Sequence, residues 1–90
     1  MTMYSDTMQK WIKRQLKHLS NNEYYVFRIL ADYRPHNLHK PDYYVIAKSK
    51  REAKIKFTQR ISWLKIYECI MCEIEIAQKI VSHPDQYIVF

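Results

Sequence analysis

Two pairs of side chains have the spacing of metal ligands or redox groups. Cys69-x-x-Cys72 has the form of half a zinc site or a redox pair, and His36-x-x-His39 lies between two prolines. A structural zinc ion needs about four ligands, and His83 is the only histidine that follows the cysteines. No cluster of carboxylates accompanies the histidines. We therefore predict no metal site, no cofactor and no catalytic residues, and we expect the cysteines to be buried and inert.

Glycine is absent from the sequence. The Walker loop, the dinucleotide-binding fingerprint and the nucleophile elbow all need a bare backbone at a tight turn or beside a phosphate, so these motifs are excluded. Helix ends and turns must instead use Asn, Asp, Ser and Pro. Such residues mark joints at 20–22, 35–37, 41–42 and 83–85.

Basic side chains are the feature that suggests a partner. The net charge is +6, and residues 1–65 hold fourteen Lys and Arg against five acids, whereas residues 66–90 hold one against four. A balance of +9 against −3 favours a polyanionic partner on the basic side. The predicted nucleic-acid-binding residues come from two basic helices and from two strand-opening tyrosines: Lys10, Lys13, Arg14, Lys17, Lys48, Lys50, Arg51, Lys54, Tyr24 and Tyr44.

Tyrosine doublets at 24–25 and 43–44 each begin a predicted strand. Because successive strand side chains point to opposite faces, each doublet contributes one ring to the core and one to the other face. If that other face is exposed, its rings are stacking platforms for single-stranded nucleic acid. If helices cover both faces, the tyrosines are ordinary strand residues at the rim of the sheet. The sequence leaves both readings open.

The elements that position these residues follow from the spacing of apolar side chains. Between Asp6 and Leu19 they recur every three or four residues, which predicts an amphipathic helix with Ser5 or Asp6 as its N-cap. Residues 23–33 and 42–48 are aromatic and β-branched and predict two strands. Their eight-residue connection is too long for a tight hairpin, but we still expect an antiparallel pair.

Ser49 and Glu52 have the S-x-x-E spacing of a capping box and predict a helix that ends near residue 60. Apolar residues at every fourth position would face the sheet: Ala53, Phe57 and Ile61.

Residues 63–76 fit both the helical and the strand period. Their isoleucines favour a strand at about 62–72, and an acidic first turn favours a helix at about 74–82, with a final strand at 86–90. We predict that residues 1–90 form a single α+β domain in the order α-β-β-α-β-α-β, with a small mixed sheet of about four strands and two to three helices. A ferredoxin-like fold is one alternative.

The chain is expected to be cytoplasmic. No apolar run approaches the roughly 18 residues of a membrane helix, and the first 19 residues lack the apolar core and cleavage site of a secretory signal. We therefore expect no membrane partner, and the oligomeric state stays open.

The composition, rich in Ile, Lys and Tyr, the small size and the strand that leads into the "SKREAK" helix at 49–54 resemble accessory proteins of large lytic bacteriophages. Such proteins often bind a host enzyme, a polymerase, a defence component or RNA. The resemblance implies a small inhibitor that acts by protein contact or by charge, and it assigns no site residue.

We predict a small basic protein without enzymatic activity that binds RNA or single-stranded DNA through its two basic helices. One alternative is an inhibitor or adaptor that binds a host protein or an acidic protein surface. Another is a small metal-independent ribonuclease that uses Lys, Arg, Tyr and His as acids, bases and phosphate ligands. The deciding question is whether the basic residues of the two helices share one face.

Overall fold

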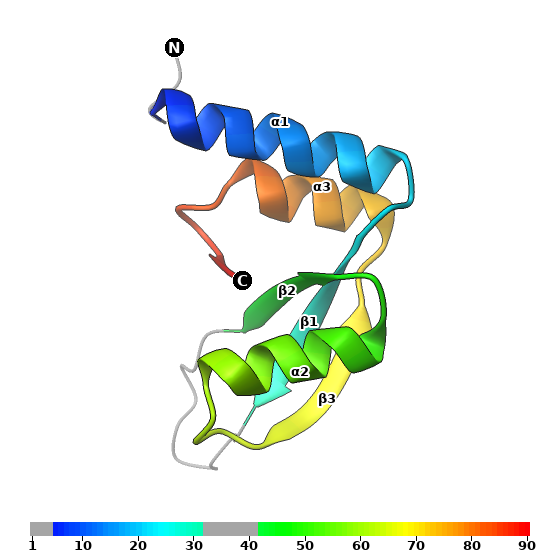
Figure 1. Cartoon of the computed structure of the whole chain (residues 1–90), viewed down its shortest axis with the longest axis vertical. Coiled ribbons are helices and arrows are strands. Elements are labelled where there is room, and N and C mark those ends of the chain that lie inside the picture. The colour runs from blue at the N-terminus through cyan, green and yellow to red at the C-terminus, as the bar shows by residue number, and fades with distance from the viewer. Residues whose placement is uncertain (1–4, 32–41) are drawn as a thin grey trace.

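The computed structural model describes residues 5–31 and 42–90. Their elements follow the order α-β-β-α-β-α-β, so the predicted α+β class and element order are confirmed (Figure 1). The helices are α1 (Asp6–Ser20), α2 (Lys50–Arg60) and α3 (Ile74–Ser82), and the strands are β1 (Tyr25–Ala31), β2 (Tyr43–Ala47), β3 (Ile66–Met71) and β4 (Ile88–Val89).

The four strands form one mixed sheet in the order β3-β1-β2-β4. β1 is antiparallel to both β2 and β3, as expected for the first two strands, and β2 is parallel to β4. A ferredoxin-like fold has the order β-α-β-β-α-β, which this chain does not follow, so that alternative is wrong.

The two crossover connections place helices on both faces of the sheet. The connection through α2 steps from β2 over β1 to β3, and the connection through α3 steps back from β3 to β4. Crossover connections between parallel strands are almost always right-handed. Two right-handed crossovers that step in opposite directions across a sheet put their helices on opposite faces. Accordingly, α2 covers one face, while α3 lies on the other with α1 packed against it (Figure 1).

The side chains of β1 alternate between two small cores. Phe27 and Ile29 are buried against Phe57 of α2, whereas Val26 is buried on the other face with Ile80 of α3 and Leu19 of α1. Burying a large apolar side chain contributes about 1.5–3 kcal/mol, so these residues hold the three layers together.

The ambiguous stretch 63–76 divides into strand and helix. Residues 66–71 pair with β1 as β3, and just beyond β3 the Cys72 N–H donates to the Val26 carbonyl over 2.8 Å. Helix α3 then begins at Ile74, as predicted from the acidic residues around that point. The expected final strand at 86–90 is shorter, because only Ile88 and Val89 pair with β2 as strand residues.

Half of the predicted capping box is formed at α2. The Ser49 hydroxyl accepts a hydrogen bond from the Glu52 N–H at 3.1 Å. The Glu52 carboxylate does not close the box but lies 3.4 Å from Lys56 Nζ, one turn further along the helix. The Ser49 hydroxyl is thus the group that fixes the start of α2.

Replacing Ser49 should therefore weaken the whole domain. We expect Ser49→Ala to lower the free energy of unfolding by about 1 kcal/mol, which corresponds to a fall in melting temperature of about 4–8 °C for a chain of this size. Thermal unfolding followed by circular dichroism measures this shift. Ser62→Ala, at an exposed position in a turn, is the matched control, and an equal effect of both changes would contradict the assignment.

Candidate nucleic-acid interface

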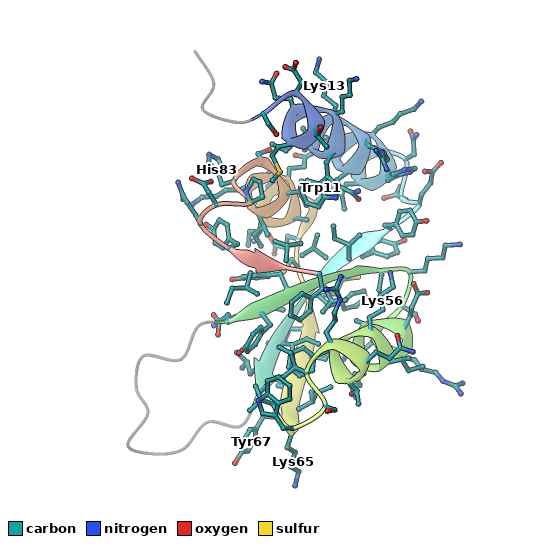
Figure 2. All side chains as sticks on the ribbon, turned by 60° about the vertical axis from the view of Figure 1, so that its left-hand side comes forward. Trp11, Lys13, Lys56, Lys65, Tyr67 and His83 are labelled. Atoms are coloured by element: carbon teal, nitrogen blue, oxygen red, sulfur yellow. The ribbon has the colours of Figure 1, made fainter. Side chains whose placement is uncertain are left out.

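The outer faces of the two basic helices point in different directions. Lys10, Lys13 and Lys17 are exposed on α1, which lies beyond α3 on one side of the sheet. Figure 2 shows Lys13 pointing away from the rest of the molecule. Lys50 and Lys54 project from α2 on the opposite side of the sheet. The two sets of residues therefore do not form one common basic face.

A second arrangement brings basic residues together beside β3. An open hollow of about 880 Å³, which we call the β3 hollow, lies between the first half of α2 and β3. Three lysines line it, Lys48, Lys50 and Lys54, together with one acidic residue, Glu68. The remaining lining residues come from the strands and the cap of α2: Tyr25, Phe27, Ser49, Tyr67, Cys69, Ile70 and Met71.

Alternation along β3 explains the exposed apolar groups in this hollow. Cys69 and Met71 lie on the face that carries α2, and Tyr67, the extra residue where the pairing with β1 shifts, also lines the hollow. Cys69 is buried beneath the helix, but Tyr67 and Met71 extend beyond it and are 66% and 55% exposed. The hollow therefore combines an accessible aromatic ring and a thioether with positive charge.

The two α2 lysines are close enough to influence the thiol at the base of the hollow. Burial raises the pKa of Cys69, and the ammonium groups of Lys54 and Lys50 act against this rise. Lys50 and Lys54 are one helical turn apart, so they present two cations on the same side of α2. The β3 hollow is suited to an anion that also carries a flat apolar group.

Lys48 connects the β3 hollow with α1. Its Nζ lies 5.7 Å from the centroid of the Tyr24 ring, a cation–π contact. Tyr24 in turn lines a second hollow of about 390 Å³ with Arg14 of α1 and Lys56 of α2. Trp11 also lines this hollow, and Figure 2 shows its position between α1 and the sheet. We call the five cations of the two hollows the basic band: Arg14, Lys48, Lys50, Lys54 and Lys56.

The two predicted stacking tyrosines are half-buried. The Tyr24 ring meets His18 edge-on at 5.1 Å, and the Tyr44 ring meets Tyr87 edge-on at 5.5 Å. Burial, followed by the negative charge of Asp42, raises the pKa of Tyr44. Because helices cover both faces of the sheet, neither ring is an open platform. Sequence reasoning missed two exposed rings, Trp63 and Tyr67, and of these two Tyr67 is the one that lines the β3 hollow.

Half of the predicted site residues come together. Lys48, Lys50 and Lys54 line the β3 hollow, and Arg14 and Tyr24 line the second hollow. The others line neither of them: Lys10, Lys13, Lys17, Arg51 and Tyr44. Lys56 and Tyr67 are additions from the structure. Tyr67 lies where the pairing of β3 with β1 shifts, so strand alternation in the sequence did not indicate its position.

The two cysteines lie on opposite faces of the sheet, as expected for a strand. Cys69 belongs to the core under α2, and Cys72 packs against the core under α3. Burial raises the pKa of both thiols, so both are mainly protonated at neutral pH. In the part of the chain that the structure describes, no three His, Cys, Asp or Glu side chains gather to hold a metal ion. His36 and His39 lie outside that part.

Comparison of the chain with protein-family models, with curated proteins and with solved structures found no significant match. Among residues 5–31 and 42–90, no helix is both long enough and apolar enough to cross a membrane.

The burial and the raised pKa of the two cysteine thiols predict how fast they are alkylated. A raised pKa leaves less thiolate at pH 8, so both thiols should react more slowly with iodoacetamide in the folded chain than in urea, and the rate should increase as the pH rises. Mass spectrometry of the labelled peptides distinguishes the two sites. Cys69, at 4% exposure, should be the slower, and reaction of Cys69 at its unfolded rate would contradict this core assignment.

Proposed function

We propose that this protein binds single-stranded nucleic acid, RNA or DNA, along the basic band. The observation that carries the proposal is the exposed Tyr67 ring in the same hollow as Lys48, Lys50 and Lys54. Proteins that bind single strands combine aromatic rings, on which bases stack, with cations that follow the phosphates. Tyr67 supplies the first group and the lysines supply the second.

The placement of the lysines works against the stability of α2. Lys48 precedes the helix and Lys50 begins it, where the helix dipole favours anions and disfavours cations by about 0.3–1 kcal/mol. Glu52 is the acid in the first turn. Charges that oppose local stability are typical of functional positions, because folding alone gives no reason for them.

A single strand fits the hollow better than a duplex does. Bases stack on a protein ring only when they are unstacked from their neighbours, as in single-stranded loops and ends. The β3 hollow is open and shallow beside its ring and lysines, and the Lys48–Tyr24 contact continues the basic band toward Arg14. A strand that starts on Tyr67 thus has a basic surface to follow toward α1.

Charge reversal in the hollow should weaken binding more than the same reversal on α1. We expect Lys50→Glu/Lys54→Glu to lower the affinity for a labelled single-stranded RNA by at least roughly tenfold, because two phosphate contacts become repulsive. Lys10→Glu/Lys13→Glu changes the net charge equally at exposed positions outside the band, and it should have a much smaller effect. Fluorescence anisotropy at low and at moderate salt measures both variants.

A loss of RNA binding in this charge-reversal test can be distinguished from a loss of folding. Lys50→Glu introduces an anion at the start of α2, so we expect the melting temperature to stay unchanged or to rise while binding falls. Equal losses for the two double variants would show that only the net charge matters. Absence of RNA and DNA binding by the unaltered protein at low salt would contradict the proposal.

The Tyr67 ring gives a second, independent test. Tyr67→Ala should cost about 1–3 kcal/mol of binding free energy, whereas Tyr67→Phe should keep most of the affinity because the ring remains. Trp63→Ala is the matched control, since Trp63 is 76% exposed but does not line the hollow.

The same titrations, analysed on a gel, show whether the RNA stays intact. Cleavage would support the ribonuclease alternative, and a partner captured after nuclease treatment at high salt would support the protein-binding alternative.

A further inference from the structure

Large apolar side chains are exposed together where β3 leads into α3. Between residues 70 and 76 only Cys72 is partly covered, and the other six residues are exposed. Four of the six are apolar, with exposures of 40% to 55%, and we call them the apolar ridge: Ile70, Met71, Ile74 and Ile76. Single exposed apolar side chains are common on protein surfaces, but a contiguous group of them marks an interaction site.

Two adjacent hollows join the four side chains into one surface. Ile70, Met71 and Ile76 line a hollow of about 350 Å³ at the end of β3. Met71 and Ile74 line a smaller hollow of about 150 Å³. Cys72 and Glu73 line both hollows, so the two lie next to each other. The apolar ridge is therefore a continuous surface that crosses from β3 to α3.

Folding of α3 gives no reason for the exposed isoleucines. The helix buries Ala77, Ile80 and Val81 in the core that it shares with α1 and the sheet. Ile74 and Ile76 lie in its first turn and stay exposed, at the point where the chain passes from β3 into α3 along the right-hand side of Figure 1. Because β-branched residues are only moderate helix formers, exposed isoleucines at these positions add little to the stability of the helix.

Acidic side chains surround the apolar ridge. Glu73 and Glu75 are exposed between its residues. Glu68, also exposed, lies two strand positions before Ile70 and on the same face of β3, in the regular part of the pairing with β1. Three carboxylates thus lie beside four apolar side chains.

The nearby cations do not cancel this negative charge. Arg28 lines the larger hollow, but its Nη2 atom lies 2.7 Å from Asp42 Oδ2, and this carboxylate balances its charge. Lys79 lies in the last turn of α3 and lines neither hollow. The surface therefore combines apolar contact area with a negative rim.

We propose that the apolar ridge binds a segment of a partner protein that carries large apolar side chains flanked by Lys and Arg. Charge complementarity selects this occupant, because the carboxylates at the rim attract basic residues while the ridge buries apolar ones. The same carboxylates disfavour a membrane, whose charged lipids are anionic. They also repel a polyanion, so this surface is separate from the proposed nucleic-acid surface.

A second copy of this chain fits the apolar ridge less well. Its basic helices α1 and α2 are described throughout, and each exposes one large apolar side chain, Met8 and Ile55. One side chain cannot cover a ridge of four. A partner of different sequence, with several apolar residues on its basic segment, is the better match.

Titration calorimetry of the full chain with two synthetic peptides tests the proposal. The first peptide is amphipathic and consists of leucine and lysine, and the second has serine in place of every leucine. We expect saturable binding of the leucine–lysine peptide, although the chain itself carries a net charge of +6. The serine–lysine peptide should bind much more weakly. Absence of binding, or equal binding of the two peptides, would overturn the proposal.

Two isoleucines give a matched pair of variants. Ile76 on α3 and Ile55 on α2 are each 49% exposed, but only Ile76 belongs to the apolar ridge. Ile76→Ser should weaken binding of the leucine–lysine peptide by roughly fivefold or more, because an apolar contact is lost. Ile55→Ser should have little effect, and an equal effect of both changes would overturn the assignment. RNA binding by Ile76→Ser should be unchanged, so failure of this proposal is distinguishable from failure of the proposed function.

The acidic rim has a matched control of its own. Glu75 and Glu52 each lie in the first turn of a helix, so reversing either charge has a similar effect on helix stability. Glu75→Lys should weaken the peptide complex by roughly threefold or more at low salt, whereas Glu52→Lys should not.

Two further measurements test the choice of partner. One is flotation of the unaltered chain with vesicles of phosphatidylserine and phosphatidylcholine, and the other is its sedimentation equilibrium. We expect neither vesicle binding nor self-association through the apolar ridge. Vesicle binding or self-association that Ile76→Ser abolishes would overturn the assignment of a protein partner of different sequence.

Discussion

The structure depends on β1, whose side chains are buried on both faces of the sheet. Phe27 and Ile29 need α2 as a cover, and Val26 needs α3 and α1. β1 is also the strand that holds β2 on one side and β3 on the other. A chain of 90 residues can bury only a limited fraction of its surface. Because β1 is buried on both faces, a single sheet contributes to two small hydrophobic cores.

This two-sided burial also determines where positive charge is available. Since α1 and α2 lie on opposite sides of the sheet, their outermost lysines diverge. In the described residues, Lys48 contacts Tyr24, which lines one hollow with Arg14 of α1 and Lys56 of α2. The lysines at the start of α2 are unfavourable for the helix itself. Their position beside the exposed Tyr67 ring is the observation on which the proposed nucleic-acid binding rests.

The two edges of the sheet differ in how the rest of the chain covers them. The β2 edge is bonded by Phe90 and Lys56, which belong to the folded chain. Among the described strands, β3 pairs with β1 alone, and it exposes the side chains of Tyr67, Ile70 and Met71.

The sequence by itself determined the local elements, because cap spacing and apolar periodicity act over a few residues. Ser49 begins α2, Ala53 and Phe57 face the sheet, and Cys69 and Cys72 fall on opposite faces, as their spacing predicted. Only the tertiary structure decided that Lys10 and Lys13 lie apart from Lys50 and Lys54, that Tyr24 and Tyr44 are covered, and that Tyr67 is exposed. The physical reason is that the spacing of apolar residues shows which face of a helix or strand is buried. Which other element packs on that face depends on the direction of each crossover and on which strand lies at the edge of the sheet.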